Sequence, residues 1–363
     1  MMKMGRIGYF KKMVSLVLLV ALICVSLCGC NKQTLTKSNQ KKDNSDKIQI
    51  GMCFDSFVIE RWQRDRDVFV SMAKELGAEV NVQNANGDAN EQKNQIEYFI
   101  KKGMDVIVIV CIDSDVICDS VKKAKDAGIK IIAYDRLIAG ANVDLYISFD
   151  NELVGSMMGQ ALVSSGLSDG KVIMICGSPN DSNVPMVEKG FREVMERSGN
   201  EIIDVVYAEG WRAECASEYV YNNLDKIKEA DAIMCGNDDL ASRLVHALSE
   251  KRLAGKKLVV GQDADLEACQ RIVEGTQLMT VYKPIEKLAQ AAAEYAVALA
   301  KNESISEMEG QLNTIDDGKY MVLYIKISPV SVTEKNMNEV IIKSGFHLKE
   351  DVYLNVPDKM PNG

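Results

Sequence analysis

Residues 105–134 read DVIVIVCIDSDVICDSVKKAKDAGIKIIAY, and this stretch decides the fold class. Val106–Val110 is an unbroken run of β-branched residues, which is typical of a strand buried on both faces of a parallel sheet. Ser114–Ala127 is predicted to form a helix that ends at Gly128, and Ile129–Tyr134 is the next predicted strand. A strand, a helix and a second strand in this order predict a parallel βαβ unit.

The same alternation extends in both directions along the chain. Before residue 105 the predicted elements are a strand at Ile48–Phe54, a helix at Arg61–Leu76, a strand at Ala78–Gln83 and a helix that Asp88 caps and that runs to Lys102. After Ser148–Asn151 the predicted helices are Glu152–Ser165, Val184–Arg197, Ala213–Leu224 and Asp239–Lys251, and the predicted strands are Lys171–Cys176, Ile202–Ala208, Ala232–Cys235 and Lys257–Gly261. We therefore expect two similar α/β units, each with a parallel sheet covered on both faces.

The composition limits the class of protein. The chain has 363 residues, of which 47% are hydrophobic, and this length predicts two globular domains with real cores. The net charge of -9 argues against a nucleic-acid-binding protein, which needs a basic face. No apolar run reaches the roughly 20 residues of a membrane-spanning helix.

The first 30 residues indicate export. Four cations precede Met13–Cys28, a mostly apolar run of signal-peptide length, and the run ends in Leu27-Cys28-Gly29-Cys30. This ending resembles a bacterial lipobox, which implies cleavage after residue 29, a lipid on Cys30 and a position on the outer side of the cell membrane. An ordinary signal peptide or an uncleaved anchor is the alternative. The polar segment 30–47 is predicted to be a flexible tether.

The remaining cysteines predict neither disulfides nor a metal site. Seven are left after Cys30, an odd number without a C-x-x-C pair, and the chain has only two histidines. Four of the seven lie in or at the ends of strand-like runs and are expected to be small core residues: Cys53, Cys111, Cys176 and Cys235. We expect no metal and no cofactor.

Polar and aromatic residues follow the predicted strands in both units. Ligands of open parallel sheets bind beyond the carboxyl ends of the strands, so these residues are the candidates for a binding cleft. They include Asp55, Glu60-Arg61-Trp62, Asp135-Arg136, Ser178 to Asn183, Gly210-Trp211, Asn237-Asp238, Gln262-Asp263 and Lys283. Carboxylates, amides and guanidinium groups bond neighbouring hydroxyls, and a tryptophan covers the apolar face of a pyranose, so this set suits a neutral sugar.

Each candidate also has a simpler interpretation. In that interpretation, Asp135 and Arg136 form a surface ion pair, and the two tryptophans, Trp62 and Trp211, are core aromatics. Asn237-Asp238 would cap the following helix, and Lys283 would be a solvated surface charge. The recurrence of such residues after strands in both units favours the cleft.

Five longer motifs resemble the D-xylose-binding proteins of bacterial ABC importers. The motifs are ERWQRDRD at 60–67, AYDR at 133–136, YISFDN at 146–151, GQDAD at 261–265 and MTVYKP at 279–284. The resemblance covers about residues 47–348. It implies the type I periplasmic binding protein fold, in which two doubly wound parallel-sheet lobes are joined by a three-stranded hinge. It also implies that the chain is not an enzyme.

The resemblance carries over to individual positions. The residues that match sugar ligands are Arg61, Trp62, Asp135, Arg136, Asn183, Trp211, Asn237, Asp263 and Lys283. The implied first lobe is 48–150 with part of about 283–312, the second is 151–282 with part of about 313–348, and 349–363 is a tail. The chain departs from the family pattern before Arg61, where residues 56–59 are more apolar, in the middle of 177–183, and at Cys235-Gly236.

Other functions fit the sequence less well. Gly166–Gly170 matches the Gly-x-Ser-x-Gly pattern of hydrolases, but it follows a helix and precedes a strand, which is the reverse of the required order. No phosphate-binding loop of an ATPase is present, and a signal peptide occupies the place of a repressor's DNA-binding helices. The expected partners are a monosaccharide, most specifically D-xylose, and the permease of an ABC importer. A sugar sensor that signals to a membrane histidine kinase, or a binding protein for another pentose or hexose, stays open as the alternative.

Overall fold

The computed structural model describes residues 47–59, 61–308 and 312–361. The predicted signal peptide, the predicted lipid site Cys30 and nearly all of the predicted tether lie outside these residues. β1 (Ile48–Phe54) begins where the sequence predicts that order begins. Within the described part of the chain, no helix combines the length and hydropathy that crossing a membrane requires.

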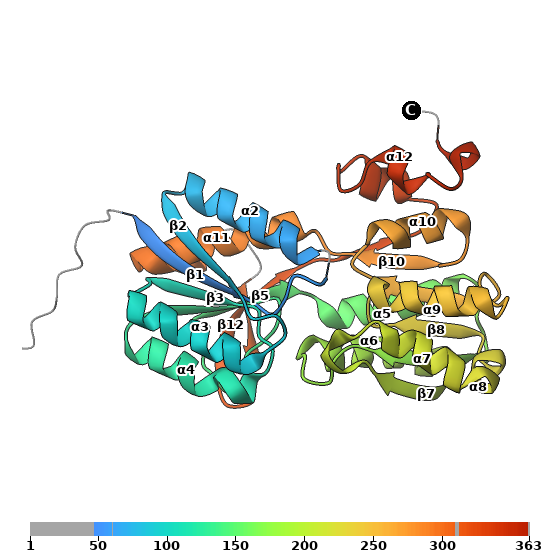
Figure 1. Cartoon of the computed structure of the whole chain (residues 1–363), viewed down its shortest axis with the longest axis horizontal. Helices are drawn as coiled ribbons and strands as arrows, with labels where there is room; N and C mark the ends of the chain where they lie inside the picture. The colour runs from blue at the N-terminus through green and yellow to red at the C-terminus, as the bar shows by residue number, and fades with distance from the viewer. Residues whose placement is uncertain (1–46, 60, 309–311, 362–363) are drawn as a thin grey trace, which may run out of the picture. The chain divides into compact units, whose positions relative to one another are not determined.

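The first sheet has the strand order β11-β12-β5-β4-β3-β1-β2 (Figure 1). Its neighbouring strands are parallel except in the hairpin of β11 and β12. The remaining strands of this sheet are β2 (Ala78–Asn84), β3 (Val106–Ile109), β4 (Lys130–Tyr134), β5 (Leu145–Phe149), β11 (Leu312–Asp316) and β12 (Met321–Ile327).

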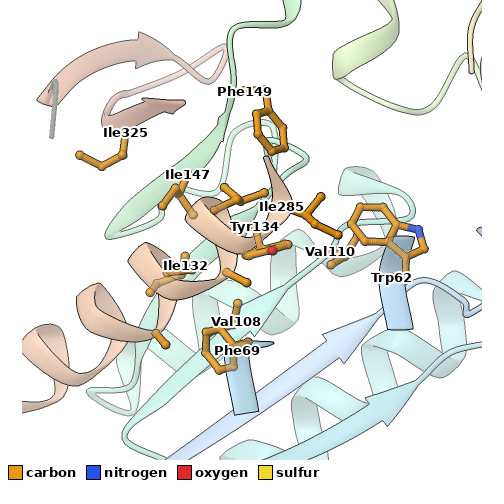
Figure 2. Packing of buried hydrophobic residues seen from close by; sticks show 14 of the residues in the cluster. Trp62, Phe69, Val108, Val110, Ile132, Tyr134, Ile147, Phe149, Ile285 and Ile325 are labelled. Atoms are coloured by element: carbon orange, nitrogen blue, oxygen red, sulfur yellow. The ribbon is translucent and has the colours of Figure 1, made fainter. Parts of the chain in front are cut away.

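Helices cover both faces of this sheet because consecutive strand residues point to opposite sides. Val106 and Val108 pack toward α2 (Arg61–Glu75) and α11 (Ile285–Lys301), whereas Ile107 and Ile109 belong to the cluster with α3 (Ala89–Lys102) and α4 (Ser114–Asp126). Figure 2 shows part of the first cluster, in which Val108, Ile132 and Tyr134 of the sheet lie near Phe69 and Ile285 of the helices. A strand buried on both sides needs apolar residues throughout, which is why 106–110 has no alternation.

The second sheet has the order β13-β10-β9-β8-β6-β7, and only β13 is antiparallel to its neighbour. Its strands are β6 (Lys171–Cys176), β7 (Glu201–Tyr207), β8 (Ala232–Cys235), β9 (Leu258–Gln262), β10 (Met279–Tyr282) and β13 (Val330–Val332). Its helices are α5 (Asn151–Ser164), α6 (Asn183–Arg197), α7 (Glu214–Asn222), α8 (Leu224–Glu229), α9 (Asp238–Glu250) and α10 (Leu266–Glu274). The predicted helix at 213–224 is thus shorter than expected, because Asn223 separates α7 from α8.

The described chain passes between the sheets three times, after β5, after β10 and between β12 and β13. These three segments agree with the expected hinge. Of residues 313–348, β12 pairs with β5 in parallel and β11 extends the same sheet, so this portion belongs to the first sheet. Only β13 joins the second sheet, since the chain crosses back after Ile327. The segment after β13 continues to α12 (Lys349–Val352).

Candidate functional site

A cavity lies at the carboxyl ends of strands from both sheets. Residues of both lobes line it. The structure brings all nine predicted site residues to its lining: Arg61, Trp62, Asp135, Arg136, Asn183, Trp211, Asn237, Asp263 and Lys283.

Arg61 and Trp62 are the first two residues of α2. The Arg61 guanidinium forms two hydrogen bonds with Asp65, at 3.2 and 3.1 Å, and an ion pair of 3.0 Å with Asp135. Tyr134 donates a hydrogen bond to Asp65, which fixes that carboxylate in turn. Burial disfavours the charged guanidinium, but Asp135 and Asp65 outweigh it, so the pKa of Arg61 lies well above its usual range. The result is a rigid cation directed toward the cavity.

The turn after β4 presents Asp135 and Arg136 to different partners. Asp135 has a φ of 64°, in the left-handed region that short polar residues tolerate best, and its Oδ1 accepts a hydrogen bond of 3.0 Å from Asn183. Arg136 donates to Asp55 at 2.8 Å, and its Nε lies 2.6 Å from Oδ2 of Asp181. Because Asp55 follows β1 and Asp181 follows β6, Arg136 links the ends of two different sheets.

The second lobe contributes amides, an indole and a carboxylate. Asn237 caps α9 by accepting a hydrogen bond of 2.9 Å from the amide of Leu240. Trp211 and Asp263 both have positive φ values, 58° and 101°. Asp263 forms an ion pair of 2.9 Å with Lys283, which follows β10 in the segment that leads to the first lobe.

The geometry decides among the simpler interpretations. Asp135-Arg136 is not a surface pair, because the two residues are 3% and 5% exposed, and Lys283 is also only 5% exposed. Trp62 and Trp211 each pack on a hydrophobic cluster and also line the cavity. Asn237 likewise both caps its helix and lines the cavity.

Two buried polar atoms of the lining have neither a hydrogen-bond partner nor an ion-pair partner among the described residues. They are Nε1 of Trp62, a donor, and Oε1 of Gln262, an acceptor. A buried polar group without a partner costs about 1–3 kcal/mol, so the cavity favours a ligand that offers both donors and acceptors. Hydroxyl groups do both.

Two carboxyl groups of the lining have pKa values that shift in opposite directions. Burial raises the pKa of Asp135, but Arg61, Lys283 and Arg136 outweigh it, so that the pKa is lowered and the carboxylate stays ionised. Burial raises the pKa of Asp181 against the opposing effect of Arg136. Within the described residues no group of three or more His, Cys, Asp or Glu is placed to hold a metal ion. All seven cysteines of these residues are free thiols, and Cys53, Cys111, Cys176 and Cys235 are buried.

Asp181 and Gln262 are among the polar residues that follow predicted strands, but the predicted ligand set does not include them, and both line the cavity. Gln262 directly precedes Asp263 at the end of β9, and its amide donates to the carbonyl of Gly236. Asp181 lies in the loop after β6, where the chain differs from the family pattern.

Comparisons with known proteins agree with this site and fold. The family of the periplasmic binding protein domain matches residues 50–304. The D-xylose-binding periplasmic protein of Haemophilus influenzae is 43% identical over 315 residues, which cover 85% of this chain and 93% of the relative. The protein of the same description from Escherichia coli is 40% identical over 314 residues, covering 85% and 94%.

Solved structures give the same picture. An ABC transporter solute-binding protein from Clostridium phytofermentans with bound β-D-glucose superposes with a TM-score of 0.76 at 26% identity, covering 84% of this chain and 99% of the other. A carbohydrate transporter solute-binding protein from Chloroflexus aurantiacus in complex with D-glucose has the same TM-score and identity, covering 85% and 98%.

Proposed function

The chain belongs to the periplasmic binding protein family, whose members bind solutes and are not enzymes. From this premise we propose that it captures D-xylose outside the cytoplasm for an ABC importer. The observation that carries the proposal is the cavity in which side chains from both sheets converge. The expectation of a binding protein rather than an enzyme agrees with the family.

The chemistry of the lining supports a neutral monosaccharide. Arg61, Arg136 and Lys283 supply donors, Asp135 and Asp263 supply acceptors, and the cations and carboxylates pair with each other. A ligand of high net charge would disturb this balance, whereas hydroxyls bond to both signs. The two tryptophans of the chain offer apolar rings for the faces of a pyranose.

The similarity to two D-xylose-binding periplasmic proteins supports xylose over other sugars. Xylose is glucose without the hydroxymethyl group at C5. Trp62 and Trp211 are the bulky side chains that would occupy the space of that group. Glucose would then open the site or leave its extra hydroxyl without a partner, at a cost of about 1–3 kcal/mol.

A competition series of xylose, glucose, arabinose and ribose, measured by isothermal titration on one preparation, tests the proposal. We expect xylose to bind roughly tenfold to a thousandfold more tightly than glucose, since 1.4 kcal/mol is a factor of ten. Arabinose and ribose each invert one hydroxyl, and misfits of buried polar groups are rejected strongly. Glucose or ribose binding as tightly as xylose would remove the xylose assignment, and no binding of any sugar would remove the function.

We further propose that Cys30 carries a lipid that holds the protein at the cell membrane. The support is the Leu27-Cys28-Gly29-Cys30 sequence after an apolar run. Acyl chains contribute about 0.8 kcal/mol per buried methylene, so two or more chains give stable attachment. Cys30→Ser is expected to move the protein from the membrane fraction to the soluble fraction, and unchanged fractionation would contradict the lipid anchor.

A further inference from the structure

Residues 135–137 of the first lobe contact residues 181–183 of the second, and we call these two segments the clasp. Each residue of one segment has one partner in the other: Asp135 with Asn183 at 3.0 Å, Arg136 with Asp181 at 2.6 Å, and the amide of Leu137 with Oγ of Ser182 at 2.8 Å. The middle pair is an ion pair between residues that are 5% and 4% exposed. Because such contacts exist only when the lobes are together, the clasp is a feature of the closed form.

Asp181 also has partners within its own lobe. Its Oδ1 accepts a hydrogen bond of 2.9 Å from the amide of Asn183, which fixes the carboxylate at the start of α6. Its Oδ2 accepts a hydrogen bond of 3.1 Å from Nε1 of Trp211, and the same oxygen faces Arg136. One oxygen atom therefore joins the first-lobe cation to the second-lobe indole.

Trp211 needs such a restraint. It has a φ of 58°, in the left-handed region, which costs a residue without a short polar side chain roughly 1–2 kcal/mol. Its ring packs directly over Gly177, where an added Cβ would lie 2.1 Å from the ring. Gly177 and Asp181 both belong to the loop after β6, so this loop determines where the indole lies.

Arg136 is held firmly to the first lobe. It donates to Asp55 at 2.8 Å and to the carbonyl oxygen of Cys111 at 3.2 Å, so it moves with that lobe when the lobes separate. Opening of the lobes would remove this cation from Asp181 and expose the carboxylate to water, which then competes with Nε1 of Trp211 for the same oxygen. Closure and the state of the loop that holds Trp211 are thereby linked.

We infer that Asp181 is a positioning residue that couples closure of the lobes to the placement of Trp211 against the bound sugar. The inference rests on the proposed function and deepens it, because it names a residue outside the predicted ligand set that affects how fast the sugar is released. Asp181 acts through Arg136 and Trp211.

The first test needs no sugar. The chain has two tryptophans, so fluorescence quenching by acrylamide in full-length protein reports Trp62 and Trp211 only. We expect Asp181→Ala to increase the quenching rate, because Trp211 loses its restraint, and we expect Trp211→Phe to abolish this increase. An unchanged quenching rate in Asp181→Ala would overturn the inference, whether or not any sugar binds. A failure of the proposed function would instead be seen in the titrations.

The second test is a double-mutant cycle on the rate of xylose dissociation. Asp181→Ala is expected to speed dissociation about tenfold to a hundredfold, which is the range for a hydrogen bond to a charged group. In the Trp211→Phe background the same substitution is expected to have a clearly smaller effect, because contacting residues are not additive. Equal effects in both backgrounds would contradict a role through Trp211.

Ser182→Ala is the matched control within the clasp. It removes the contact with Leu137 but no contact of Trp211, so its effect on dissociation is expected to be the same in both backgrounds and its quenching unchanged. Asp181→Glu keeps the carboxylate and is expected to recover part of the slow dissociation. If Asp181→Ala does not fold, as judged by thermal unfolding, the double-mutant cycle is measured with Asp181→Glu instead. The longer side chain moves the carboxylate oxygen away from its position between Arg136 and Trp211.

Discussion

Three residues of the candidate site, Asp135, Trp211 and Asp263, have positive φ values although none is a glycine. Such backbone conformations cost of order 1–3 kcal/mol each and persist where the surroundings enforce them. Here the enforcing contacts are specific: Arg61 and Asn183 hold Asp135. These turns place the three side chains in the lining of the cavity at the strand ends.

Asp135→Ala tests the central acceptor of the cavity. The substitution removes the carboxylate that pairs with Arg61 and accepts from Asn183, and it leaves a buried cation without one partner. We expect xylose binding to weaken by about 2 kcal/mol or more, measured by isothermal titration. Ser168→Ala, in an exposed loop with only Asp169 as its side-chain partner, is expected to bind as the unaltered protein does. Full affinity of Asp135→Ala would contradict the site.

Sequence reasoning reached most of the site because strand ends are recognisable. Asp135 directly follows a clear strand, and the order of strands in a parallel sheet places such positions at one edge. Asp181 was left out of the predicted ligand set because its importance depends on Arg136, 45 residues earlier and in the other lobe, and on an indole 30 residues later. No local periodicity encodes a contact of that kind.

At the scale of elements, α5 and α6 show what a close helix crossing requires. A Cβ on Gly155 would lie 1.9 Å from the carbonyl oxygen of Val187, and a Cβ on Gly190 would lie 1.9 Å from that of Glu152. The glycines are therefore reciprocal, each making room for the backbone of the other helix. Since α6 begins at Asn183, this crossing also supports the second-lobe side of the cavity.

Gly190→Ala is expected to destabilise the protein because two backbones would have to separate. Overpacking of this kind costs at least about 1–3 kcal/mol, which a urea denaturation curve would detect. Gln160→Ala, on an exposed face of α5, is the control and is expected to change stability little. A stability of Gly190→Ala equal to that of the control would mean that the helices are not in the close contact described.

Asp238, the first residue of α9, makes stability depend on pH. Its carboxylate is completely buried and accepts hydrogen bonds from Thr280 and Gln277, with the charges of Arg271 and Asp263 nearby. Burial raises its pKa to about 7, while Arg271 opposes the rise. A raised carboxyl pKa means that the folded state holds a proton which the unfolded state loses, so folding stability decreases between about pH 4 and pH 7.

Asp238→Asn cannot ionise, so it removes this contribution. The variant is expected to be less stable at low pH, because the amide cannot accept both hydrogen bonds of the acid, but to lose less stability as the pH rises from about 4 to 7. Thermal unfolding of both proteins over this range gives the comparison. Parallel curves would show that Asp238 does not titrate in this window.

The elements themselves were partly predictable. The strands and helices between residues 48 and 134 are close to those expected, because each has a clear apolar pattern and a capping residue such as Asp88 or Gly103. The placement of β11 and β12 was not, because their sheet is decided by pairing with β5, more than 150 residues earlier. Neither strand contains a signal that distinguishes the two sheets.

At the scale of the whole molecule, three chain crossings and the clasp join two lobes that each have their own core. A ligand that contacts both lobes stabilises the closed form through its differential contacts. If only one lobe bound the sugar, hydrogen exchange in the other lobe would not change. The response of both lobes therefore measures whether the cavity is the site.

Hydrogen exchange with and without xylose can separate these cases segment by segment. We expect residues 133–138, at the end of β4, and residues 177–184, which include the loop after β6, both to exchange more slowly when xylose is present. At a sugar concentration of 100 times Kd, the closed form gains about 2.7 kcal/mol, so the local slowing approaches a hundredfold. α4, on the far face of the first sheet from α2 and α11, is the internal control, because it takes no part in the cavity lining and gains no contact. Slowing confined to residues 177–184 would mean that the second lobe binds the sugar without Asp135 and Arg136, and the two-lobe site would have to be abandoned.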